Sequence, residues 1–94
     1  MGGDPRVRRH VVVRGRVQGV WFRVTCAREA EARHVAGWVR NREDGDVEAV
    51  FEGQPEDVES MLAWCRRGPS GARIDEVVAV EEDPSGRTGF AIVG

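Results

Sequence analysis

The chain contains no lysine and no long apolar run. All 14 basic residues are arginines, which excludes Schiff-base chemistry and a lysine nucleophile. No apolar stretch approaches the roughly 20 residues that a membrane-spanning helix needs. The N-terminal segment MGGDPRVRRH lacks the apolar region of a secretory signal peptide. We therefore expect a cytoplasmic protein with no membrane partner.

Cysteine usage and charge give no sign of a metal centre or of a protein that coats nucleic acid. Cys26 and Cys65 lie far apart, without a CxxC motif or a nearby histidine pair, so the spacing of a metal site is absent. We expect reduced core thiols rather than a disulfide. The 94 residues carry 14 basic and 16 acidic side chains and a net charge of −2, and this balance argues against nucleic-acid coating.

The apolar pattern predicts alternating strands and helices. Val11–Val13 form a predicted strand that Gly15 closes. Apolar residues four apart predict a helix over residues 22–33. A second helix is predicted from Pro55 to the stop signal Gly68-Pro69. The other predicted strands are 36–41 and 47–53 around the hairpin turn Asp44-Gly45, then 74–82 and 90–93 around a turn at residues 84–86.

The order β-α-β-β-α-β with a short final strand predicts a ferredoxin-like α+β sandwich, in which two antiparallel helices cover one face of an antiparallel sheet. We expect one domain over residues 1–94, with a core at about 7–93 and a flexible tail at 1–6. The uncovered face has no aromatic platform for stacking RNA bases, so we expect no nucleic-acid partner. Its predicted outward residues are His10, Val12 and Arg14 on the first strand and Glu48, Val50 and Glu52 on the third.

The segment GRVQGVWFR (Gly15–Arg23) connects the first predicted strand to the first helix. The first N–H groups of a helix lack partners and lie at the positive end of its dipole. Gly15 and Gly19 would let the loop turn its amides inward around a tetrahedral anion, and Arg23 could add a guanidinium fork. The GxxxxGK[ST] pattern of a nucleotide P-loop is absent. An ordinary turn with a solvated arginine is the open alternative.

Four blocks, in order, resemble the acylphosphatase family: GRVQGVWFR, GWVRNREDGDVE (37–48), FEG (51–53) and GPSGARIDEV (68–77). The similarity runs from about Val11 to Ile92. It implies the fold inferred above and the hydrolysis of acyl phosphates to a carboxylate and inorganic phosphate, with no metal or organic cofactor. It also implies that Asn41 orients the attacking water and that the phosphate is bound by Arg23 and the backbone amides of Gln18, Gly19, Val20, Trp21 and Phe22.

The implied chemistry explains why no further catalytic group is needed. A carboxylate whose acid has a pKa of about 4 leaves without a general acid, and fixed amides with one guanidinium can stabilise the phosphoryl charge. The expected partner is a small acyl phosphate, with inorganic phosphate as product and competitive inhibitor. Two helices over one sheet suffice for a monomer. A non-enzymatic anion-binding or regulatory module on the same scaffold stays open as the alternative, whereas the surface composition disfavours an RNA-binding sheet.

Two positions depart from the family's pattern. His34 stands where relatives often have a glycine that ends the first helix, so we expect a histidine with positive φ. Arg42 follows Asn41 where relatives often have a small hydroxylated residue, so no hydroxyl contact is expected there. Trp21, beside the loop, is a candidate to line the entrance for the acyl group.

Overall fold

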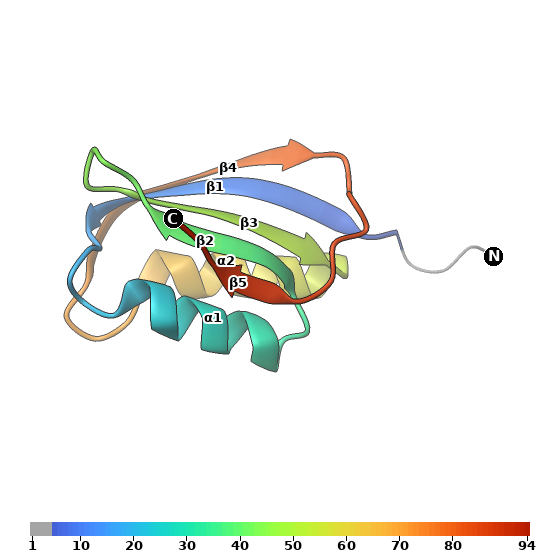
Figure 1. Cartoon of the computed structure of the whole chain (residues 1–94), viewed down its shortest axis with the longest axis horizontal. Helices are drawn as coiled ribbons and strands as arrows, with labels where there is room; N and C mark the ends of the chain where they lie inside the picture. The colour runs from blue at the N-terminus through green and yellow to red at the C-terminus, as the bar shows by residue number, and fades with distance from the viewer. Residues whose placement is uncertain (1–4) are drawn as a thin grey trace.

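The computed structural model describes residues 5–94, and its elements alternate as the sequence predicts. A five-stranded sheet in the order β4-β1-β3-β2-β5 carries two helices of opposite direction on one face (Figure 1). The ferredoxin-like α+β sandwich is therefore confirmed. The elements are β1 (Val7–Arg16), α1 (Phe22–Ala32), β2 (Ala36–Asn41), β3 (Val47–Gly53), α2 (Pro55–Arg67), β4 (Arg73–Glu82) and β5 (Phe90–Ile92).

The connection between β4 and β5 differs from the predicted turn. The two strands lie on opposite edges of the sheet, so residues 83–89 form a linker across the end of the sheet (Figure 1). It crosses four strand spacings, roughly 19 Å, and its seven residues reach only about 25 Å. β5 must therefore start beside the start of β2. Gly37 pairs with Phe90 in a parallel ladder, so the prediction of a wholly antiparallel sheet is wrong for this pair.

The hydrophobic core lies between the sheet and the helices. Phe22, Cys26 and Ala30 of α1 are buried, as their spacing predicts. α2 buries Val58, Met61, Leu62 and Cys65. It also buries Trp64, which packs on Phe22 with ring centroids 5.1 Å apart. No helix among residues 5–94 is long and apolar enough to cross a bilayer. The strands supply Val11, Val13, Val39, Val47, Ala49 and Phe51 to this core.

Both cysteines are buried free thiols. Burial raises the pKa of Cys65 to about 12 and raises the pKa of Cys26 well above its ordinary value. The thiolate, rather than the thiol, is the nucleophile and the metal ligand. Cys26 and Cys65 therefore serve the packing of the core.

The turn that follows α1 contains a residue in the left-handed region, as the sequence predicts. His34 has a φ of 57°, and the next amide, that of Val35, donates back to the carbonyl of Ala30 at 2.8 Å. This bond satisfies a carbonyl of the last helical turn and turns the chain directly into β2.

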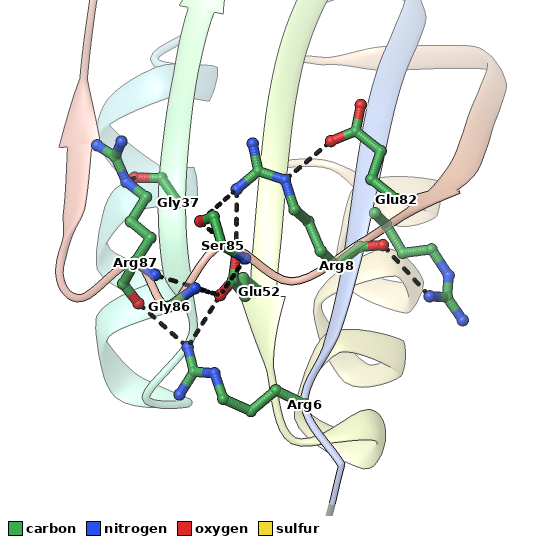
Figure 2. Close-up of polar contacts among 9 residues, drawn as sticks. Arg6, Arg8, Gly37, Glu52, Glu82, Ser85, Gly86 and Arg87 are labelled. Atoms are coloured by element: carbon green, nitrogen blue, oxygen red, sulfur yellow. Dashed lines mark hydrogen bonds and ion pairs between the residues drawn. The ribbon is translucent and has the colours of Figure 1, made fainter.

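Glu52 does not lie on an exposed face, contrary to the prediction. Its side chain is fully buried, because the β4–β5 linker passes over it (Figure 2). The backbone N–H groups of Ser85, Gly86 and Arg87 donate to its carboxylate at 2.7–3.2 Å. The Ser85 hydroxyl and the Arg8 guanidinium each donate at 3.0 Å. The carboxylate therefore fixes the linker to β3.

These donors keep the buried carboxylate charged. Burial alone would raise the pKa of Glu52, but the bonds from the Ser85 amide, from Arg8 and from the Gly86 amide outweigh it and lower the pKa to about 2. Arg6 lies 3.7 Å from the carboxylate and donates to the carbonyl of Arg87 at 3.1 Å. Arg6, which belongs to the predicted tail, therefore contacts both the carboxylate and the linker. Residues 1–4 of that tail lie outside the described residues.

The prediction that Val50 is exposed is also wrong, because this residue is only 1% exposed. Its neighbours across the sheet are His10 on β1 and Trp38 on β2. These two rings meet edge to face, with centroids 6.5 Å apart, on the face of the sheet that carries no helix. Val50 therefore lies between two larger ring-bearing residues on the neighbouring strands.

We expect the substitution Glu52→Gln to lower the free energy of unfolding by about 2–4 kcal/mol at pH 7, because the linker amides and Arg8 lose their charged acceptor. The folded-state pKa of about 2 lies below the ordinary value of 4.5, so this stabilisation is complete above about pH 5 and is lost as the pH falls toward 2. Urea unfolding of the parent and of Glu52→Gln between pH 3 and pH 7 measures the difference in their free energies of unfolding. This difference should become smaller as the pH falls.

Glu82→Gln is the matched control, because Glu82 also pairs with Arg8, at 2.8 Å, but its side chain is 40% exposed. Its loss should cost less than about 1 kcal/mol. Equal costs for the two variants, or a Glu52→Gln protein as stable as the parent, would contradict the anchoring role.

Candidate active site

The start of α1 lacks the groups that normally compensate a helix N-terminus. Trp21 occupies the N-cap position with a φ of 63°, provides no side-chain cap, and is followed by a first turn without acidic residues. The first helical bond runs from the Thr25 amide to the Trp21 carbonyl at 3.1 Å, so the preceding N–H groups have no helical partner. α2 instead has Glu56 and Asp57 in its first turn. The positive end of α1 therefore has no compensating acidic side chain in its own first turn.

The two glycines of the motif have different functions. Gly19 has a φ of 77°, and no heavy atom would lie within 4 Å of an added Cβ. The loop is thus open to a ligand at this point. Gly15 lies inside β1, where the register with β4 shifts, and an added Cβ would lie 2.0 Å from the Arg73 carbonyl oxygen. Gly15 therefore permits close strand packing at a bulge. It lies within β1 and neither closes the strand nor belongs to the loop, contrary to the prediction.

Arg23 and Asn41 meet in one pocket although they are distant in the sequence. Arg23 is the second residue of α1 and Asn41 the last residue of β2, and both line a pocket of about 280 Å³. No salt bridge among residues 5–94 involves Arg23, whereas Arg8 and Arg40 each pair with a glutamate. The charge of Arg23 is therefore available to a ligand. The other lining residues are Val17, Gly19, Trp21, Phe22 and Val24.

Two of the predicted loop residues do not line this pocket. Val20 packs partly against the core. Gln18 reaches away along the loop, and its side-chain amide donates to the carbonyls of Arg42 at 2.8 Å and Asp46 at 3.0 Å. The side chain of Gln18 thus ties the β1–α1 loop to the β2–β3 turn, both at the left end of the molecule in Figure 1. The sequence motif contained Gln18 but gave no sign of this clamp.

The β2–β3 turn that follows Asn41 is held by its own polar groups. The Arg42 amide donates to the Asp46 carbonyl at 2.8 Å, and the Gly45 amide donates to the Arg42 carbonyl at 3.3 Å. The Arg42 guanidinium pairs with Asp44 at 3.1 Å. The Asp46 amide and Arg42 lower the pKa of Asp44. Arg42 therefore stabilises the turn beside Asn41.

Metal-ligating side chains do not gather in the described part of the chain. Residues 5–94 contain no group of three or more histidine, cysteine, aspartate or glutamate side chains placed to hold a metal ion. His10 instead contacts Glu48 through Nε2 at 2.5 Å, and Arg40 pairs with the same glutamate at 2.6 Å. This cluster lies on the sheet surface. Among the residues that line the pocket, Arg23 is the one that carries a charge.

The sequence and the fold of this chain both match known acylphosphatases. The acylphosphatase family model matches residues 9–92. An acylphosphatase of Natronomonas pharaonis is 53% identical over 87 residues, which cover 93% of this chain and 95% of the relative. An acylphosphatase of Thermococcus kodakarensis is 52% identical, with coverage of 95% and 98%. The solved structure of an acylphosphatase from Coxiella burnetii superposes with a TM-score of 0.93 at 32% identity, covering 99% of this chain and all of that one.

We expect Gln18→Ala to reduce kcat/KM about tenfold or more while the protein stays folded, because the two bonds that hold the loop against the turn after Asn41 are lost. Steady-state kinetics with an acyl phosphate and a thermal unfolding curve provide the measurement. Gln54→Ala is the control, since Gln54 precedes α2 at the opposite end of the sheet. A Gln18→Ala enzyme with the parent's kcat/KM would show that the clamp has no part in catalysis.

Proposed function

The chain belongs to the acylphosphatase family and hydrolyses acyl phosphates, and from this premise we propose that its site is the pocket at the start of α1. In this reaction the water oxygen bonds to phosphorus as the bond from phosphorus to the acyl oxygen breaks. The carboxylate leaves with the electron pair, and the proton of water passes to phosphate or solvent. The observation that carries the proposal is that Arg23, without an acidic partner in residues 5–94, shares a pocket with Asn41 at an uncapped helix start.

In the proposed site, Arg23 and the loop amides hold the phosphoryl group. The guanidinium presents a planar fork of N–H donors that matches two phosphoryl oxygens. The amides of Gly19, Trp21 and Phe22 come from the loop and helix start that line the pocket, and the resemblance to the family adds those of Gln18 and Val20. Fixed donors of this kind stabilise charge on the phosphoryl oxygens of the transition state without reorganising.

Asn41 is proposed to orient the attacking water. Its side-chain amide has both an acceptor oxygen and donor N–H groups, so it can accept from water while donating to a phosphoryl oxygen. Its place at the end of β2, next to the turn that Gln18 ties to the loop, supports this assignment. Correct placement of a nucleophile removes much of the entropic part of the barrier.

The proposed reaction needs neither a general acid nor a metal ion. The leaving carboxylate is a weak base and departs unprotonated, and Arg23 with the amides supplies the positive charge that a metal would otherwise provide. Inorganic phosphate, the product, offers the same oxygens to the same donors, so we propose it as a competitive inhibitor. One chain supplies every proposed residue, which supports activity as a monomer, and two buried free thiols fit a reducing cytoplasm.

Arg23→Ala and Asn41→Ala should impair different steps. Removing the guanidinium should lower kcat about 10²–10³-fold and also weaken inhibition by phosphate, because Arg23 contacts the anion before and during reaction. Asn41→Ala should lower kcat about 10²-fold or more while phosphate binds almost as in the parent. The measurement is kcat on an acyl phosphate and the inhibition constant of phosphate, both in excess chelator, where the parent should keep its full rate.

Arg28→Ala provides the control, because Arg28 is an exposed arginine farther along α1 and should leave both quantities unchanged. The assignment fails if Asn41→Ala turns over normally, or if it loses phosphate binding as severely as Arg23→Ala. A parent rate that disappears with chelator and returns with Mg²⁺ would refute the metal-free mechanism.

A further inference from the structure

Trp21 combines two features that are unfavourable for a large aromatic residue. Its side chain is 77% exposed, and its backbone lies in the left-handed region, with φ 63° and ψ 24°. In residues 5–94, Trp21 and His34 are the only residues other than glycine that have a positive φ. Strained backbone conformations concentrate at functional sites, where surrounding structure maintains them.

The fold itself gains little from this indole ring. Trp64 is 5% exposed and packs on Phe22, and Trp38 meets His10 edge to face. No aromatic pair and no side-chain hydrogen bond in the described residues includes Trp21. Core packing therefore does not explain its presence at the helix start.

The position of Trp21 relative to the catalytic pocket points to a different role. Trp21 and Val24 both line the pocket that contains Arg23 and Asn41, and they are one helical turn apart. Val24 is 39% exposed, so the two side chains form an apolar rim beside a polar end. The two parts of an acyl phosphate differ in the same way, since a charged phosphoryl group is joined to an acyl group that can be apolar.

We propose that Trp21, with Val24, forms the acyl-group subsite and makes the enzyme prefer aromatic over small aliphatic acyl phosphates. The proposal rests on the proposed function, because it requires the phosphoryl group to lie at Arg23. The indole face would then stack with a planar aroyl group, an arrangement that aromatic rings favour. An acetyl group is too small to cover the indole and gains much less.

The test compares kcat/KM for benzoyl phosphate with kcat/KM for acetyl phosphate. The two substrates share the phosphoryl group, so changes in phosphate binding or in the loop amides cancel in the ratio. Trp21→Asn removes the ring and keeps a residue that tolerates positive φ. We expect the benzoyl-to-acetyl ratio to fall about fivefold to tenfold, the size of an aromatic stacking contribution. Trp21→Phe should keep most of the parent's ratio.

His34→Asn is the matched control, because it replaces the other left-handed ring residue, and its ratio should stay within about twofold of the parent. An unchanged ratio in Trp21→Asn, or a fall of equal size in His34→Asn, would overturn the subsite. Arg23→Ala, assayed with both substrates, tests the proposed function separately: if both rates survive, the phosphoryl assignment is wrong, whereas the ratio alone decides whether Trp21 contacts the acyl group.

Discussion

A helix that begins without a capping side chain or an acidic residue leaves its first N–H groups without an acceptor, and the arrangement around α1 follows from this constraint. Gly19 keeps the loop open above these groups. β2 ends with Asn41 in the same pocket, and Gln18 ties the loop to the turn that follows β2. Arg23 adds further positive charge where an acidic residue would be more usual, which suits the site to a phosphoryl group.

At the opposite end of the sheet, backbone N–H groups have an anionic acceptor that belongs to the chain itself. There the consecutive amides of residues 85–87 point at the carboxylate of Glu52, which holds the β4–β5 linker in place (Figure 2). Backbone amides are therefore grouped at both ends of one small sheet, and those of the linker have the carboxylate of Glu52 as their acceptor. At one end a glutamate of the chain occupies them permanently, and stability results. At the other end, in the function proposed above, the amides at the start of α1 bind the phosphoryl group of the substrate.

Local patterns in the sequence predicted most of the fold. The four-residue spacing from Phe22 to Ala30, Pro55 at the start of α2 and the Asp44-Gly45 turn each depend on neighbouring residues, and each prediction agrees with the structure. The path of residues 83–89 depends instead on strand order, which alternation along the chain does not encode. The burial of Glu52 follows from that path and was missed for the same reason.

The predicted site residues came from the family motif, and the pocket brings Arg23 and Asn41 together as that motif implies. The clamp by Gln18 and the left-handed backbone of Trp21 depend on tertiary geometry and could not be predicted from residue types.

The central claim is that the open amides at the start of α1 bind the phosphoryl group. Amide chemical shifts during a titration with inorganic phosphate test it most directly. The largest saturable shifts should fall on Gly19–Phe22 and on the Arg23 side-chain N–H, and shifts concentrated elsewhere, with these signals unmoved, would contradict it.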